Sequence, residues 1–157
     1  MQELLQVLST VHIFRGIPPD VIAEIAEHGR LLRFPRGSGI VRQGDASESL
    51  YVILKGHARV ERSHPQIIRP VLLASLGPGD VAGEMGILDN EPRSATVLAE
   101  TDVEALEIPG VILGRLIVQR PDLGAALLKI LSRRLRSTDD LLAKLASESE
   151  QVNQQTQ

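Results

Sequence analysis

Residues 50–62 read LYVILKGHARVER and contain the two patterns that decide the fold. The first five residues are continuously apolar, which indicates a strand at the centre of a sheet. Gly56 interrupts the run, and residues 57–62 then alternate polar and apolar side chains, as a half-buried strand does. The surrounding chain is therefore expected to consist of short β-strands.

The same organisation extends in both directions from this stretch. Short runs rich in Val, Ile and Leu are separated by turn residues roughly every eight to twelve positions, a spacing typical of β-sandwiches and barrels. The separating segments are rich in Gly, Pro, Asp and Asn: Pro35-Arg36-Gly37, Gly44-Asp45, Gly56, Gly77-Pro78-Gly79-Asp80 and Asn90-Glu91-Pro92. Residues 30–108 are therefore predicted to form an antiparallel β-barrel of the double-stranded jelly-roll type, in a mainly β protein with flanking helices.

Helices are expected on both sides of the barrel. Residues 1–29 carry apolar side chains at helical spacing, with Pro18 and Pro19 opening a helix and Gly29 closing it. The helical period returns over residues 109–147, after the last predicted strand. The predicted order is therefore helices, barrel, helices.

The longer C-terminal helix carries an apolar stripe. Its members are spaced alternately three and four positions apart: Leu128, Leu131, Leu135, Thr138, Leu142 and Leu145. This heptad spacing predicts a homodimer that pairs two copies through the helix over residues 122–147. The alternative is that the stripe packs against the barrel of its own chain. Residues 148–157 form a polar tail that is expected to fray, so we expect a single domain over residues 1–147.

Bulk composition excludes several classes of protein. A chain of 157 residues can hold one domain with a sizeable core. With 17 basic and 20 acidic residues the net charge is -3, which gives no reason to expect nucleic acid as a partner of this chain. There are no cysteines, so disulfides and thiolate metal sites are excluded. No apolar run approaches the roughly 20 residues of a membrane span, and we expect a cytoplasmic protein with no membrane contact in this chain.

The most informative chemistry lies in residues 83–96, which read GEMGILDNEPRSAT. Two glycines allow the backbone to approach a ligand closely, and the amides of a short helical turn can point at a phosphate. Glu84 offers a carboxylate that can accept a hydrogen bond from a sugar hydroxyl. Arg93 supplies a planar donor fork that matches a phosphate, and Ser94 can donate to the same oxygen. The segment therefore predicts an anion-binding cradle.

This segment resembles the phosphate-binding cassette of cyclic-nucleotide-binding domains. The residues that match the cassette pattern are Gly83, Glu84, Pro92, Arg93, Ser94, Ala95 and Thr96. The resemblance extends over about residues 5–145 and includes fold markers at residues 14–17, 43–45 and 50–56. It implies ligand contacts from Gly83, Glu84, Met85, Arg93 and Ser94. In such a site the arginine and serine hold the ring phosphate, and the glutamate holds the ribose hydroxyl.

The long helix resembles the dimer helix of the bacterial catabolite-activator branch of this family, through Arg133-Arg134-Leu135 followed by Thr138. The resemblance implies that Thr138 hydrogen-bonds the adenine amine across the subunit interface. Arg133 and Arg134 are interpreted as solvated helix charges. Ala82 stands where the family often has a bulky aromatic residue. Because aromatic residues make up only 2% of the chain, the base is expected to rest on aliphatic side chains, which favours adenine.

Together these features predict a regulatory module that binds a cyclic nucleotide and couples binding to movement of its C-terminal helices. The expected ligand is cAMP, with cGMP as the alternative, and neither catalytic residues nor a cofactor are expected. Two alternatives stay open: a structural or interaction domain of the same fold that has lost its ligand, and a sensor fragment of a larger regulator or channel. A DNA-binding helix-turn-helix is not expected, because the sequence ends soon after the dimer helix.

A cupin-like metalloenzyme would share the barrel, but it needs clustered metal ligands. His12, His28, His57 and His64 form no His-x-His pair followed by a carboxylate. No metal site is therefore expected.

Overall fold

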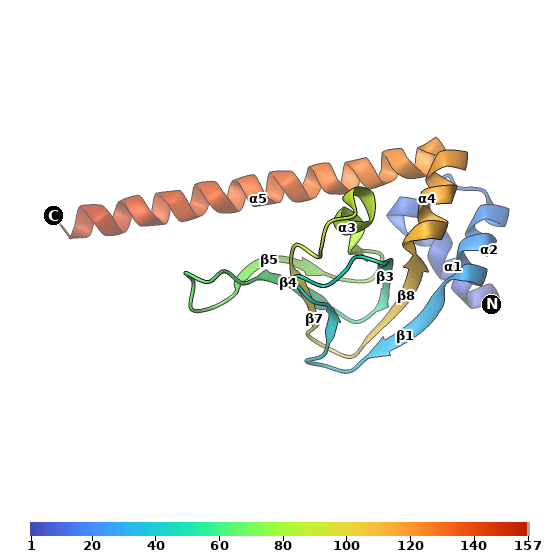
Figure 1. Ribbon diagram of the computed structural model, residues 1–157, viewed down its shortest axis with the longest axis horizontal. Helices are drawn as coiled ribbons and strands as arrows, with labels where there is room; N and C mark the ends of the chain where they lie inside the picture. The colour runs from blue at the N-terminus through green and yellow to red at the C-terminus, as the bar shows by residue number, and fades with distance from the viewer. Residues whose placement is uncertain (157) are drawn as a thin grey trace.

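The structure, a computed structural model, describes residues 1–156, and for Met85 it describes the backbone only. Helices gather at one end of a β-sandwich, and one long helix starts at that end and runs past the strands (Figure 1). No helix among residues 1–156 is long and apolar enough to cross a membrane.

Two α-helices and a short 3-10 helix precede the sheets: α1 (Gln2–Thr10), η1 (His12–Phe14) and α2 (Pro19–His28). Pro19 is the first residue of α2, where a missing amide hydrogen costs no helical hydrogen bond. Gly29 follows the last turn, and its amide donates to the carbonyl of Ile25 at 2.8 Å. The predicted beginning and end of this helix are confirmed.

Within residues 1–156, eight strands form two four-stranded antiparallel sheets. The first sheet has the order β1 (Arg30–Phe34), β8 (Val103–Pro109), β3 (Ser49–Lys55) and β6 (Val81–Ala82). The second has the order β2 (Gly39–Val41), β7 (Thr96–Ala99), β4 (Ala58–Arg62) and β5 (Val71–Leu76). The two sheets stay separate and do not close into one barrel. The predicted antiparallel jelly-roll fold with flanking helices is confirmed.

Strand β3 occupies the inner position that its continuous apolar run predicts, between β8 and β6. Leu50 and Val52 belong to the core under the helices, whereas Ile53 belongs to the core between the sheets. Gly56 follows the strand with a φ of +86°, and a Cβ there would lie 2.1 Å from the carbonyl oxygen of Asp102. Only glycine therefore fits where the chain passes from the first sheet to the second.

The helices cover the outer face of the first sheet. Helices α1, α2, α4 (Gly110–Gln119) and the first turns of α5 (Pro121–Gln155) share one apolar core with strands β3 and β8. Phe14, Leu106 and Leu113 are fully buried in it, and burying each such side chain stabilises the fold by about 1.5–3 kcal/mol. This core fixes the base of α5 against the sandwich.

Helix α5 is a single helix of 35 residues, longer than the predicted helix over residues 122–147. Helical structure continues through the predicted polar tail over residues 148–157 as far as Gln155, and Gln157 lies outside the described residues. No Gly or Pro occurs after Gly124, so nothing interrupts the helical hydrogen bonding. Beyond its first turns the helix projects away from the helical end of the molecule and passes over α3 (Glu84–Asp89; Figure 1).

Candidate functional site

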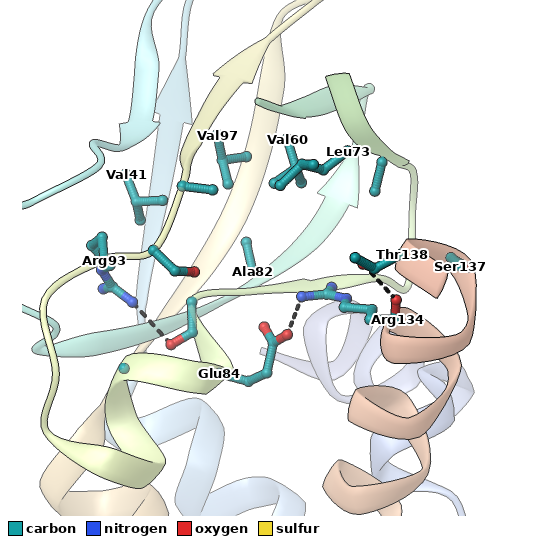
Figure 2. Close-up of a pocket in the computed structure, with 15 residues that line it drawn as sticks. Val41, Val60, Leu73, Ala82, Glu84, Arg93, Val97, Arg134, Ser137 and Thr138 are labelled. Atoms are coloured by element: carbon teal, nitrogen blue, oxygen red, sulfur yellow. Dashed lines mark hydrogen bonds and ion pairs between the residues drawn. The ribbon is translucent and has the colours of Figure 1, made fainter. Parts of the chain in front are cut away.

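A cavity lies between the second sheet, the turn of α3 and helix α5 (Figure 2). Its aliphatic wall is formed by Val41, Val60, Leu73, Ala82 and Val97. The polar side chains around it are Glu84, Arg93, Ser94, Arg134, Ser137 and Thr138. A mostly apolar chamber with a few convergent polar groups is typical of a site for a small organic ligand.

The glycine that begins this site is sterically required. Strand β6 ends at Ala82, and Gly83 then adopts a φ of +86° before α3 begins at Glu84. A Cβ on Gly83 would lie only 2.2 Å from Nη1 of Arg93. The absence of a side chain at this position therefore allows the arginine to pass directly against the backbone.

Arg93 is held in place by two backbone carbonyls. Its side chain is only 7% exposed. Nη1 donates to the carbonyl oxygen of Gly83 at 2.9 Å, and Nη2 donates to that of Ser49 at 2.7 Å. Burial lowers the pKa of the Arg93 guanidinium, although an arginine remains protonated at neutral pH. Each amino group of Arg93 keeps a second hydrogen, so the guanidinium can still bind an anion.

The ring of Tyr51 packs against the guanidinium of Arg93. The Arg93 guanidinium carbon lies 5.9 Å from the centre of the Tyr51 ring, within the range of a cation–π contact. The Tyr51 hydroxyl donates to the carboxylate of Glu107 at 2.8 Å. Burial, together with this hydrogen bond and the charge of Glu107, raises the pKa of Tyr51 to about 12. The ring is therefore fixed at its hydroxyl end while its face meets the cation.

Glu84 is 2% exposed and forms an ion pair with Arg134, which reaches into the cavity from α5. The same guanidinium also donates to the backbone carbonyl of Val81. Figure 2 shows the two side chains pointing toward each other across the space between α3 and the long helix. This contact ties α5 to the cassette segment at the polar end of the cavity.

The charges around the cavity favour an anion. Among its described lining residues the ionisable groups are Glu84, Arg93 and Arg134. Two guanidinium groups and one carboxylate leave a single positive charge. Because much of the cavity lining is apolar, that charge acts through a lower dielectric than water provides. The arrangement can therefore balance one negative charge on a ligand.

The family model described as the cyclic nucleotide-binding domain matches residues 31–120, which include residues 83–96 and every strand residue of the two sheets except Arg30. The chain belongs to the cyclic nucleotide-binding domain family. The resemblance that residues 83–96 carry is therefore confirmed.

This cyclic nucleotide-binding domain is similar to proteins of more than one kind. It is 34% identical, over 89% of its length, to a CRP-like cAMP-activated global transcriptional regulator of Mycobacterium tuberculosis. The crystal structure of the Thermus thermophilus catabolite activator protein matches 85% of the chain with 34% identity and a TM-score of 0.73. A cyclic nucleotide-gated potassium channel of Mesorhizobium japonicum is 33% identical over 66% of the chain, which covers 27% of the channel. The chain spans 62% of the length of each of the first two proteins.

The structure brings most of the predicted site residues of the domain together. Gly83, Glu84, Arg93 and Ser94 all line the cavity, and Thr138 joins them from α5. The Thr138 hydroxyl donates to the carbonyl of Arg134 at 3.0 Å, within its own helix. The side chain of Met85, also predicted to contact the ligand, lies outside the described part of the structure. Ligand contact by these residues stays a prediction.

The interpretation of Arg134 as a solvated helix charge is wrong, whereas Arg133 is indeed exposed. The sequence holds a signal that could have distinguished them. Leu123, Leu127 and Arg134 lie at helical spacing on one face of α5, and both leucines are fully buried. A second apolar stripe, which begins at Leu128, lies on another face of the same helix.

No group of three or more His, Cys, Asp or Glu side chains among the described residues could hold a metal ion. The polar atoms of the cavity are instead those of two cations, one carboxylate and hydroxyl groups.

Proposed function

We propose that this domain is a regulatory module that binds cAMP, without catalysis and without a cofactor. The observation that carries the proposal is that Glu84 and Arg93 line one cavity that also has an aliphatic wall. A cyclic nucleotide offers a monoanionic phosphodiester, a ribose hydroxyl and an apolar base face. The cavity offers a complementary group for each of these three parts.

The ring phosphate is placed against Arg93 and Ser94. Arg93 is rigidly positioned by the carbonyls of Gly83 and Ser49, and its remaining N–H groups can donate to the phosphate oxygens. Ser94 stands next to it in the chain and lines the same cavity. A preorganised cation binds an anion more tightly because little side-chain freedom is lost on binding.

The ribose hydroxyl is placed against Glu84, which in the free domain is paired with Arg134. A ligand that donates a hydrogen bond to Glu84 must share this carboxylate with Arg134 or displace it. Binding therefore changes a contact made by α5. This competition is the physical link by which we propose that the ligand alters the position of the C-terminal helices.

The base is placed along the aliphatic wall, near Val60 and Leu73, with its edge toward Thr138 of α5. Aliphatic side chains accept the apolar face of a purine, and the threonine hydroxyl can accept a hydrogen bond from the adenine amine. The relative from Mycobacterium tuberculosis is named as cAMP-activated, which also favours cAMP over cGMP.

We further propose that two copies pair through α5. Four leucines of the heptad stripe are 45–66% exposed: Leu128, Leu135, Leu142 and Leu145. The stripe therefore does not pack against the sandwich of its own chain, and a second copy of the helix would bury it. Within a larger regulator or channel, a change in the position of this helix would signal to the rest of the protein whether the nucleotide is bound.

A second candidate is a structural domain of the same fold that binds no nucleotide. One observation favours it: Glu84 and Arg93 already have protein partners in the free domain. Because both charged side chains have partners within the protein, the domain can stay folded without a ligand.

Titration calorimetry with cAMP and with cGMP tests the proposed function. We expect cAMP to bind more tightly than cGMP, and Arg93→Ala to weaken cAMP binding by about thirty-fold or more, since a buried anion would lose its charged partner. Arg133→Ala is the matched control, because Arg133 is an exposed arginine on α5. This variant should bind cAMP like the wild type. Heat signals absent for both nucleotides would favour the structural domain instead.

A further inference from the structure

One row of side chains crosses all four strands of the first sheet and ends at the cavity. Arg30 of β1 lies opposite Glu107 of β8, which in turn lies opposite Tyr51 of β3. Tyr51 lies opposite Ala82 of β6, which lines the cavity (Figure 2). Directly opposed residues of an antiparallel sheet project from the same face. Ala82 and Ala105 belong to the core between the sheets, and Ala105 shares a face with Glu107, so the row faces that core.

Glu107 places a carboxylate on this inner face. Its side chain is 17% exposed, and both of its oxygens have partners. One oxygen accepts a hydrogen bond from Arg30 at 3.0 Å, and the other accepts one from the Tyr51 hydroxyl at 2.8 Å. A carboxylate is costly to bury without such partners. None of the nucleotide contacts proposed above involves this group.

Strand β3 supplies two of the contacts that hold Arg93. The carbonyl of Ser49 accepts a hydrogen bond from Nη2 of Arg93, and the centre of the Tyr51 ring lies 5.9 Å from the guanidinium carbon. Phe34 meets the Tyr51 ring edge to face, with 6.2 Å between the ring centres. The hydroxyl bond to Glu107 holds the far end of the ring. The position of the ring against Arg93 therefore depends on Glu107.

Resting on the proposed function, we propose that Glu107 is a positioning residue for the nucleotide phosphate, which acts through Tyr51 on Arg93. Glu107 is not among the described residues that line the cavity, so it acts without touching the ligand. By holding the Tyr51 hydroxyl it keeps the ring against the guanidinium, and the guanidinium keeps its orientation. A preorganised arginine binds an anion more tightly than a mobile one.

The charge of Glu107 has the opposite effect on an anionic ligand. Burial lowers the pKa of Arg93, and the charge of Glu107 is among those that oppose this shift. A negative charge near the guanidinium weakens the attraction of the site for a phosphate. If charge alone mattered, an apolar side chain in place of Glu107 would tighten nucleotide binding. If positioning dominates, the same substitution weakens it, so the two roles predict opposite signs.

Titration calorimetry with cAMP on variants of the full chain measures this sign. Glu107→Leu removes the acceptor of the Tyr51 hydroxyl, and we expect it to weaken binding about fivefold. Glu107→Gln keeps an amide oxygen that accepts the same hydrogen bond, so it should bind cAMP at least as tightly as the wild type. Tyr51→Phe loses the same hydrogen bond and should weaken binding by a similar factor. Adding Glu107→Leu to Tyr51→Phe should weaken binding no further.

Glu104→Leu is the matched control. Glu104 lies on the same strand, forms an ion pair with Lys55 at 3.5 Å and is 25% exposed. Within the described part of the chain it has no interaction with Tyr51 or Arg93. This variant should bind cAMP like the wild type. Urea denaturation checks that each variant is folded, and Tyr51→Phe, which deletes a single oxygen atom, keeps the test decisive if Glu107→Leu fails to fold.

The titration of Tyr51 gives a second readout that needs no ligand. Burial, the hydrogen bond to Glu107 and the charge of Glu107 raise the pKa of Tyr51 to about 12. Glu107→Leu should lower this pKa, whereas Glu104→Leu should leave it unchanged.

The outcomes separate this proposal from the proposed function. Unchanged or tighter cAMP binding by Glu107→Leu would overturn the positioning role alone, as would equal weakening by Glu107→Leu and Glu107→Gln. A pKa of Tyr51 that stays at about 12 in Glu107→Leu would also overturn it, because the contact on which it depends would be missing. A wild-type chain that binds neither cAMP nor cGMP would instead overturn the proposed function, and this proposal with it.

Discussion

The guanidinium of Arg134, midway along α5, forms an ion pair with Glu84, the first residue of α3. Fifty positions separate the two residues in the sequence. The carboxylate is almost completely buried, whereas the arginine keeps part of its side chain exposed. A buried carboxylate requires a partner, so the free domain uses its own helix for this purpose.

Removing Arg134 should destabilise the free domain. In Arg134→Ala, Glu84 loses its partner inside the protein, and we expect the free energy of unfolding to fall by about 1–3 kcal/mol. Urea denaturation measures the loss. Arg133→Ala deletes a neighbouring exposed arginine from the same helix and should change stability by less than about 0.5 kcal/mol. Equal stability of the two variants would show that the ion pair contributes nothing.

Gly83→Ala should disturb the site more than its backbone conformation alone explains. The new Cβ would be 2.2 Å from Nη1 of Arg93, so the arginine must leave its position. Gly79→Ala is the matched control: its φ of +90° is equally unfavourable for alanine, but nothing lies within 4 Å of the added Cβ. We expect Gly79→Ala to cost about 1 kcal/mol of stability and to keep nucleotide binding. Gly83→Ala should cost more stability than Gly79→Ala and should also abolish nucleotide binding. Calorimetry and urea denaturation of the pair decide this.

Leu135→Lys should convert a dimer into a monomer without unfolding the domain. Leu135 is 64% exposed in the single chain, so its replacement removes little from the core. A charge at an a position of a paired helix is costly, because it would be buried at the seam. Ile68→Lys, at a fully exposed loop position, is the control. Sedimentation should show a monomer for Leu135→Lys and a dimer for Ile68→Lys, with unchanged circular dichroism for both.

Tyr51 should make the stability of the domain depend on pH in the alkaline range. Its pKa is raised to about 12, so the folded state binds a proton that the unfolded state releases near pH 10. The stability from this group is complete below pH 10 and is lost as the pH rises toward 12. Tyr51 is the single tyrosine of the chain and tryptophan is absent, so the ultraviolet absorbance of tyrosinate reports on it alone. The titration should move from about 12 in the folded domain to about 10 in urea; identical values would contradict the buried hydrogen bond to Glu107.

Local patterns in the sequence predicted much of the fold and the cassette. The turn residues around Gly56 and Gly79 mark strand ends because few other residues adopt their backbone conformation. The continuous run of β3 predicted an inner strand because both of its faces are buried. Glu84 and Arg93 were predicted together because they belong to one short segment, whose geometry is set locally by a glycine turn and a proline.

The rest depends on contacts between distant segments. The pairing of Arg134 with Glu84 follows from how α5 crosses α3, and no local pattern fixes that crossing. The role of Ser49 as an acceptor for Arg93 is equally non-local, since it is a backbone carbonyl and its residue type carries no signal. The length of α5 was underestimated because a polar composition was interpreted as disorder, although Glu and Gln are good helix formers.

Because helix α5 is uninterrupted, a tilt at the height of the cavity would be carried to its far end. The 21 steps of the helix from Arg134 to Gln155 span about 32 Å at 1.5 Å per residue. Each degree of tilt at the height of the cavity would then displace the tip by about 0.5 Å, so a tilt of about 6° would become a movement of about 3 Å at the far end. Because the helix has no glycine or proline after Gly124 at which it could kink, such a tilt would move its far end as one rigid unit.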